Sequence, residues 1–368
     1  MGGQSKLMRE LRRLQGQVSA PLRKAKARAL AAWWQRARED RLDVREGALP
    51  WTGRAALFLL YQPGGVAAST YETLAALQAA GYAPLVVCNG GVPAEDAGRL
   101  AGMAWRVIQR PNIGYDFGGY RDGLWYLGKT APEPGALLIL NDTVWLPATG
   151  QRDTLADLAG LGADYAVLSN FMYRPRSRRS DALVRQVYGS SFGMLLSPAV
   201  LRHPGFAAFW DGLPLYAEKA KVVELGEVGF SRAMAAAGFA PRALMDWQET
   251  RDRVAALDRA GLAQFLRDLP VLNTRIRDSH AALVARFGDR TEPLEPLRDA
   301  ALELLYDLNP WDSLAVNGLA SGQVDFVKKA NIKHPPNAVK FLAMCDSRGV
   351  ALRPCVRSEI EALAARKA

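Results

Sequence analysis

The stretch RPNIGYDFGGYRDGLWYLGK (residues 110–129) decides the fold together with LLILNDTVW (residues 137–145), which follows it after a short loop containing proline and glycine. Glycines and polar side chains alternate closely in the first part, at Asn112, Gly114, Asp116, Gly118, Gly119 and Arg121. Glycine beside polar side chains is typical of a loop that approaches a ligand closely. This stretch therefore predicts a binding loop that opens a helix.

The second part is an apolar run that ends abruptly in polar residues. Leu137 to Leu140 fits a fully buried parallel strand, and Asn141, Asp142 and Thr143 follow it directly. Open α/β sheets bind ligands at the carboxyl ends of their strands. Two structural alternatives stay open: an ordinary turn at Gly118-Gly119 and a helix N-cap at 141–143. The two pieces lie one strand apart in the predicted sheet, so we favour a ligand site.

Outward from this stretch, apolar runs alternate with amphipathic segments of about ten residues. The pattern predicts strands over 55–61, 83–89, 104–109, 137–140, 164–168 and 190–197, and helices over 69–81, 93–102, 119–129 and 152–161. Such alternation argues for an α/β fold with a mostly parallel sheet and helices on both faces. We expect three parts: a basic helical segment (1–50), the α/β core (53–245), and a helical connector with a basic C-terminal region (246–368).

Composition is that of a globular protein able to bury a large core. The chain has 368 residues, of which 49% are hydrophobic. Cys88, Cys345 and Cys355 are odd in number and lack metal-ligand spacing, which indicates neither a disulfide framework nor a zinc site and favours a reducing compartment. No apolar run approaches the roughly 18 residues of a membrane span. We therefore expect a cytoplasmic protein.

Most of the net charge of +10 lies at the N-terminus. Residues 1–40 hold ten Lys or Arg and three acidic residues. Apolar residues recur there at helical spacing, first from Leu7 to Val18 and, after Pro21, from Leu22 to Trp34. Two interpretations remain open: an interfacial anchor on an anionic membrane surface, or a pair of helices packed on the body with a solvated basic face. Nucleic acid is not expected, because no nucleic-acid motif accompanies the charge.

Three other groups of residues are candidates for a site. Glu227 precedes a predicted helix over 230–237, where it is either a general base or a carboxylate favoured at a helix N-terminus. A late basic turn with Lys328, Lys329, Lys333 and His334 either closes over a diphosphate or is simply solvated. His334 is the one histidine whose neighbours suit a ligand role. The arginines of the loop 173–179 either bind an anionic substrate or are simply solvated.

Several of these motifs, in order, resemble the rhamnan synthesis protein F family of bacterial polysaccharide glycosyltransferases. The resemblance covers roughly residues 53–356, and it is carried by RPNIGYDFGGYRDGL, LLILNDTVWLP, SSFGMLLS, GEVGFSRAMAAAGF and NPWDSLAVNGLASGQVDFVKKANIKHPPNA. It implies a nucleotide-sugar-binding sheet of the GT-A type, which is Rossmann-like. It also implies transfer of a sugar from a nucleotide diphosphate to a lipid-linked glycan, such as O-antigen, on the inner face of the membrane.

Carried over by position, the resemblance gives each candidate a role. The donor would be bordered by Asn112, Gly114, Asp116, Gly119, Arg121, Asn141, Lys328, Lys329 and His334. Asn141-Asp142 stands where GT-A enzymes usually carry Asp-x-Asp, which holds Mg²⁺ or Mn²⁺ on the donor diphosphate. Only Asp142 is acidic here, so either a metal binds Asp142, with His334 as a further candidate ligand, or Asn141 hydrogen-bonds the donor.

The chemistry of sugar transfer fits this assignment. The charge of the leaving diphosphate must be neutralised, by a metal or by Lys and Arg, and a base must take the acceptor proton. Here Asp142 with Lys328 and Lys329 supplies the first, and Glu227 the second. Direct attack with Glu227 as base predicts inversion, with rhamnose as the first expected sugar. The alternative is a non-catalytic nucleotide- or glycan-binding protein. An oxidoreductase is disfavoured, because no Gly-x-Gly-x-x-Gly turn follows the first strand.

Overall fold

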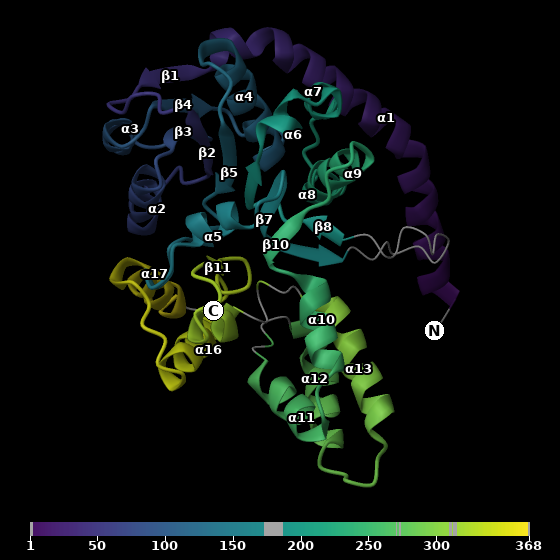
Figure 1. Ribbon diagram of the computed structural model, residues 1–368. Helices are drawn as coiled ribbons and strands as arrows, with labels where there is room; N and C mark the ends of the chain where they lie inside the picture. Colours follow the sequence, from purple (N-terminus) through teal and green to yellow (C-terminus); the bar gives the residue numbers. More distant parts are fainter. Residues whose placement is uncertain are drawn as a thin grey trace.

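A computed structural model describes residues 3–172, 187–269, 271, 274–308, 311 and 315–366, without side chains at 3–20, 274, 275 and 307. Figure 1 shows an α/β body, a long N-terminal helix that arcs over it, and two helical parts below it. The arginine loop 173–179 lies outside the described residues.

Nine of the described strands form one large mixed sheet in the order β1-β4-β3-β2-β5-β9-β7-β10, with β8 paired to β7. Their bounds are β1 (Asp43–Glu46), β2 (Arg54–Leu60), β3 (Ala83–Asn89), β4 (Arg106–Arg110), β5 (Ala136–Asn141), β7 (Tyr165–Met172), β8 (Val187–Gly189), β9 (Gly193–Leu196) and β10 (Arg242–Met245). The chain runs from β2 outward to β3 and β4, then returns to β5 on the other side of β2. This reversal creates a topological switch point between β2 and β5.

The prediction of an α/β sheet is confirmed, but the prediction that it is mostly parallel is wrong. Strands β4, β3, β2 and β5 are mutually parallel, as are β7 and β10. Strand β9 runs antiparallel to both β5 and β7, and β1 and β8 are antiparallel to β4 and β7. All four residues of β9 are buried. A continuous apolar run shows that a strand is buried on both faces without showing its direction.

Alternate side chains of the central strands enter two separate cores, because successive residues of a strand face opposite sides of the sheet. Phe58 and Leu60 of β2 pack with α2 (Ala68–Ala79), α3 (Ala94–Gly102) and α5 (Thr154–Gly160). Leu57 and Leu59 pack on the other face with α4 (Tyr115–Thr130), α6 (Pro198–Arg202), α7 (Pro204–Gly212) and α9 (Val228–Ala236). Helices therefore cover both faces, as expected.

Helix α4 begins earlier than the sequence predicts, and this changes the role of two glycines. Gly118 and Gly119 are buried in the helix instead of lying in a loop. A Cβ on Gly118 would lie 2.0 Å from the carbonyl oxygen of Ile113, and one on Gly119 would lie 2.0 Å from Leu59 Cδ1. These glycines thus let α4 pack closely on its own entry turn and on β2.

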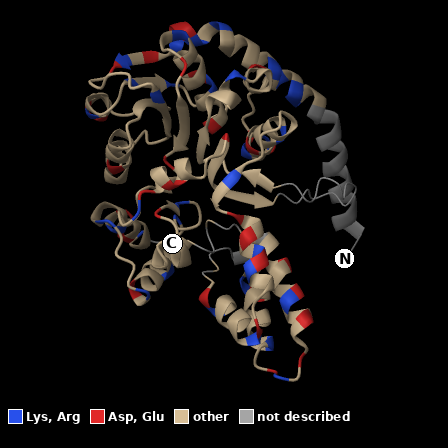
Figure 2. Cartoon of the chain, viewed as in Figure 1, with Lys and Arg blue, Asp and Glu red and all other residues tan. Residues whose placement is uncertain are grey.

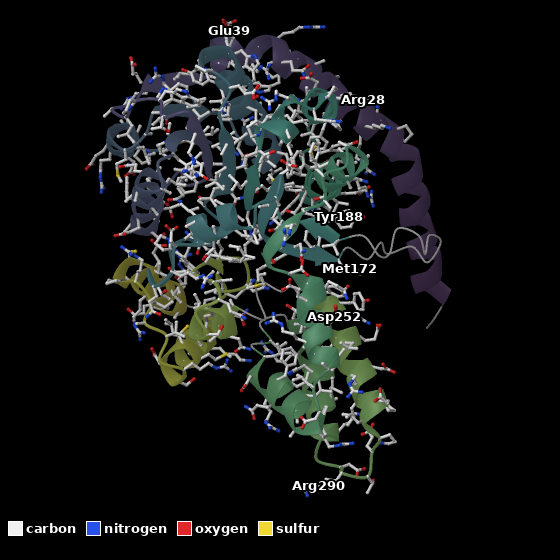
Figure 3. All side chains as sticks on the ribbon, viewed as in Figure 1. Arg28, Glu39, Met172, Tyr188, Asp252 and Arg290 are labelled. Carbon is white, nitrogen blue, oxygen red and sulfur yellow. The ribbon has the colours of Figure 1, made fainter. Side chains whose placement is uncertain are left out.

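Two further hydrophobic cores lie outside the sheet. Helices α10 (Trp247–Ala255), α11 (Arg259–Asp268), α12 (Thr274–Arg286) and α13 (Leu294–Asp307) share one core, and Arg290, labelled in Figure 3, lies in the loop at the far end of this unit. Helices α15 (Ala315–Ala320), α16 (Pro335–Ser347) and α17 (Pro354–Ala364) form the other with Trp145. Trp145 belongs to β6 (Val144–Trp145), which pairs with β11 (Val327–Lys328). The late basic region is therefore tied to the end of β5.

The N-terminal segment forms one helix, α1 (Gly3–Arg41), with Pro21 inside it, where the sequence predicts two helices. Its second half is packed on the body, since Trp34 is fully buried and contacts Leu215. Basic side chains are spread along the described part of α1, which carries Arg28 and Glu39 (Figures 2 and 3). Among the described residues, no helix has both the length and the apolar composition that a bilayer span requires.

Candidate functional site

A cavity of about 630 Å³ opens at the carboxyl ends of β2 and β5, at the switch point of the sheet. It gathers segments that are far apart in sequence. It is lined by Leu30, Tyr61, Asn89, Asn112, Ile113, Gly114, Tyr115, Asp116, Phe117, Asp142, Thr143, Ser191, Tyr216, Ala217, Lys219, Val222, Val223, Glu227 and Lys333. Six of the candidate site residues named from sequence are among them: Asn112, Gly114, Asp116, Asp142, Glu227 and Lys333.

The first wall of the cavity is the entry to α4. Gly114 has φ +77°, a left-handed conformation that glycine adopts at little cost, and a Cβ there would lie 2.4 Å from Leu215 Cδ2. Tyr115 also has a positive φ, +52°, which is unusual for a bulky residue. Its hydroxyl donates to the carbonyl of Ala217 at 3.0 Å. This turn aims the N-terminus of α4, with Asp116 in its first turn, into the cavity.

Asp142 stands at the end of β5, where it also fixes the end of β2. Its Oδ2 accepts hydrogen bonds from the Tyr61 backbone N–H at 3.0 Å and from Gln62 Nε2 at 2.9 Å. The neighbouring Asn141 is buried, and its Nδ2 donates to the Tyr120 hydroxyl at 2.9 Å and to Asp116 Oδ2 at 3.4 Å. Asn141 therefore lies behind the cavity wall, where it holds Tyr120 and Asp116, whereas Asp142 lines the cavity itself.

Glu227 does not lie at a free helix N-terminus, contrary to the structural alternative left open from sequence. It ends a π-helical turn (Val223–Glu227) between α8 (Lys219–Val222) and α9, so the helix runs through it. Gly226 allows this turn to press on α4, since a Cβ there would lie 2.6 Å from the ring of Phe117. Glu227 Oε2 accepts from the backbone and hydroxyl of Ser191. A π-helical turn is often found at a functional site.

Burial and neighbouring charges act in opposite directions on the acids of the cavity. Desolvation raises the pKa of Glu227, while Ser191 and Lys328 favour its ionised form. Desolvation also raises the pKa of Asp116, which the positive charges of Lys328, Lys219 and Lys333 oppose. Carboxyls of raised pKa beside cations in a cavity are typical of sites that transfer protons.

The structure does not bring every predicted residue to the cavity wall. Gly119 is buried against β2. Lys329 is buried beneath Trp145, with Nζ 3.8 Å from Glu359 Oε2. Lys328 is close to the wall, because its Nζ donates to Thr143 Oγ1 at 2.5 Å. His334 is an exposed residue at the start of α16 and is not among the lining residues.

Arg121 has a structural position instead of the expected place beside a ligand. Its guanidinium is buried, donates to the carbonyl of Leu213 at 3.2 Å, and lies near the charges of Asp122 and of Arg38 in α1. The next residue, Asp122, is also buried and accepts from Trp34 Nε1 at 2.7 Å and from Arg110 Nε at 2.8 Å. This cluster fastens α1 to α4 and β4.

Several lining residues were not predicted from sequence, among them Tyr61, Tyr115 and Lys219. Tyr61 and Tyr115 are 55% and 37% exposed, and both are aromatic side chains of the cavity wall. Lys219 begins α8. The sequence signal for Tyr61 was its place as the last residue of the first predicted strand, 55–61. Lys219 gave none, because nothing in its neighbourhood distinguishes it from a solvated lysine.

Residues 85–265 match the model of the family described as "Rhamnan synthesis protein F". This confirms the resemblance over a shorter span than 53–356. The uncharacterized protein y4gN of Sinorhizobium fredii (strain NBRC 101917 / NGR234) is 30% identical over 244 residues, which make up 64% of this chain and 60% of that protein. The chain thus aligns with less than two thirds of that relative. The matched family segment contains most of the cavity wall but not Leu30, Tyr61 or Lys333.

Proposed function

Because residues 85–265 are similar to the rhamnan synthesis protein F family, we propose that this protein is a glycosyltransferase of polysaccharide synthesis. The donor would be a nucleoside diphosphate sugar bound in a GT-A-like manner. The observation that carries the proposal is the cavity at the switch point, which brings Asp116, Asp142 and Glu227 together with Lys219 and Lys333. Carboxylates beside cations suit a reaction that accepts a proton and releases a diphosphate.

The proposed reaction exchanges one bond at the anomeric carbon of the donor sugar. The bond from this carbon to the diphosphate oxygen breaks, and its electron pair leaves with the nucleoside diphosphate. The acceptor hydroxyl oxygen forms the new bond, and its proton passes to the Glu227 carboxylate. Attack from the face opposite the leaving group inverts the anomeric configuration. The N-terminus of α4 supplies partial positive charge near the phosphates.

We propose a lipid-linked glycan as acceptor, with the N-terminal helix on an anionic membrane surface. The described part of α1 exposes Lys24, Lys26 and Arg28 together with Leu22, which is 74% exposed (Figure 2). A basic helix with exposed apolar residues suits the headgroup region of a bilayer. Leu30 of the same helix lines the cavity. A docked α1 would therefore hold the cavity close to a lipid-linked acceptor. Rhamnose remains the first donor sugar to test.

The direct test is turnover of donor sugars by the full chain. Rhamnose, glucose and galactose attached to dTDP or UDP are incubated with the protein, with Mn²⁺ or with a chelator, and the released nucleoside diphosphate is measured. We expect one donor to be hydrolysed faster than the others. Nucleotide binding without release of diphosphate from any donor would instead favour a non-catalytic binding protein. Absence of both binding and release would contradict the proposal.

The aromatic wall of the cavity gives a separate prediction about nucleotide affinity. Tyr61 packs on Gly90, where a Cβ would lie 3.4 Å from the tyrosine ring, and exposes its other side. We expect Tyr61→Ala to lose stacking on the nucleobase worth about 1–3 kcal/mol, or roughly 5- to 150-fold in affinity. Calorimetric titration with dTDP and UDP measures it. Tyr61→Phe keeps the ring and should bind these nucleotides with nearly the wild-type affinity. If Tyr61→Ala also binds with the wild-type affinity, the nucleobase does not stack on Tyr61.

A further inference from the structure

The described residues do not offer the ligands of a protein-held divalent cation. Asp142 has one carboxylate oxygen engaged by Tyr61 and Gln62. Asn141 supplies no charge, and its side chain is bonded within the protein. No group of three or more His, Cys, Asp or Glu side chains that could hold a metal ion occurs in the part of the chain that the structure describes. Mg²⁺ and Mn²⁺ prefer several oxygen ligands.

Three lysines from two distant parts of the chain lie near the Asp116 carboxyl of the cavity. Lys219 begins α8, while Lys328 lies on β11 and Lys333 in the turn that precedes α16. Lys219 and Lys333 line the cavity and are exposed to solvent. All three lie close enough to the Asp116 carboxyl to favour its ionised form.

Contacts with Thr143 and Phe192 help to fix the position of Lys328. Its Nζ donates to Thr143 Oγ1 at 2.5 Å, and it lies 4.0 Å from the centroid of the Phe192 ring. Thr143 is the residue after Asp142, so this ammonium group stands beside the end of β5. The pairing of β11 with β6 holds it there. The late basic region is thus positioned by β6, the strand that follows Asp142 in the sequence.

We propose that Lys219, Lys328 and Lys333 neutralise the diphosphate of the donor in place of a divalent cation held by Asp142. Lysine ammonium groups bind phosphate as compact point charges, and they act on the leaving group without a metal. This inference rests on the proposed function and adds its mode of phosphate binding. Asp142 then acts by holding the ends of β2 and β5 together, through its hydrogen bonds to Tyr61 and Gln62.

The test is binding of dTDP and UDP to the full chain at low ionic strength, measured by calorimetry with EDTA and with Mn²⁺. We expect affinities within about threefold of each other under the two conditions. Lys219→Met and Lys333→Met should each weaken binding about tenfold in EDTA, the size expected for loss of a charge-assisted hydrogen bond at an exposed site. Both side chains are exposed, so the variants should fold.

Lys221→Met is the matched control. Lys221 lies on the same short helix as Lys219, pairs with Glu224 at 2.8 Å and does not line the main cavity, so nucleotide affinity should not change. Binding that needs Mn²⁺, or that is unaffected by both lysine variants, would overturn the inference while leaving the glycosyltransferase proposal intact. If neither dTDP nor UDP binds under either condition, the glycosyltransferase proposal itself is contradicted.

Discussion

Glu227→Gln is expected to lower the rate of sugar transfer by about 10²- to 10⁴-fold, the usual contribution of a positioned general base. Glutamine keeps the size of the side chain and can still contact Ser191, but it cannot accept the acceptor proton. Donor affinity should change little, because Glu227 faces the acceptor proton in the proposed reaction. Single-turnover rates with the best donor, together with nucleotide affinity, separate these two effects.

Glu224→Gln is the control for this substitution. Glu224 lies one helical turn earlier, pairs with Lys221 and does not line the cavity. Its loss should leave the transfer rate within about twofold of wild type, as for a surface ion pair. If Glu227→Gln transfers sugar at the wild-type rate, another group accepts the proton and the base assignment is wrong.

The same carboxyl predicts a pH dependence. Burial raises the pKa of Glu227 above its ordinary range of about 4.3, and only the ionised form can act as base. The transfer rate should therefore fall as the pH is lowered through this raised pKa, at a higher pH than an ordinary glutamate would give. The transfer rate of the wild type, measured as a function of pH, should show this fall at acidic pH as an acid limb. The limb should be absent from the residual activity of Glu227→Gln.

Asp122→Asn is expected to cost about 3–5 kcal/mol of unfolding free energy, since it removes one partner of a buried ion pair. The carboxylate lies between the indole of Trp34 and the guanidinium of Arg110, and Arg38 is 3.9 Å from its second oxygen. The buried guanidinium of Arg121 also interacts favourably with this charge. Asparagine would leave these cations without a buried counter-charge, and α1 would lose its fastening to the body.

Urea unfolding followed by tryptophan fluorescence measures this cost. Glu39→Gln is a matched control, because Glu39 also joins α1 to α4, through an exposed pair with Lys129. A surface pair contributes only about 0–1 kcal/mol. An Asp122→Asn variant as stable as the Glu39→Gln variant would show that the buried cluster does not hold α1 in place.

Much of the central fold could be predicted from the sequence. Ala83–Asn89 was predicted with its observed bounds, and the strand that ends at Asn141 was placed to within one residue. These segments are continuous apolar runs bounded by polar turns, and such runs are buried wherever they occur. The start of α4 was missed, because Gly118 and Gly119 look like loop residues until β2 and the entry turn are seen pressing against them.

The candidate site could be predicted only in part. Asn112, Gly114, Asp116, Asp142 and Glu227 were named from sequence and line one cavity. Arg121 belongs to the same motif, yet it faces the buried cluster under α1, because residues on a helix point in all directions. Lys219 and Tyr61 gave no comparable pattern.

The sequence by itself determined the α/β architecture, the two-sided burial of the central strands and the polar ends that could carry chemistry, because all of these follow from local periodicity. Tertiary structure alone decided the direction of β9, the meeting of Lys219 with Lys333, and which face of α4 looks into the cavity. These depend on contacts between segments that are far apart in sequence, as for Lys328 and Thr143 with a separation of 185 residues. Such contacts arise from packing the whole chain and leave no mark on the local pattern.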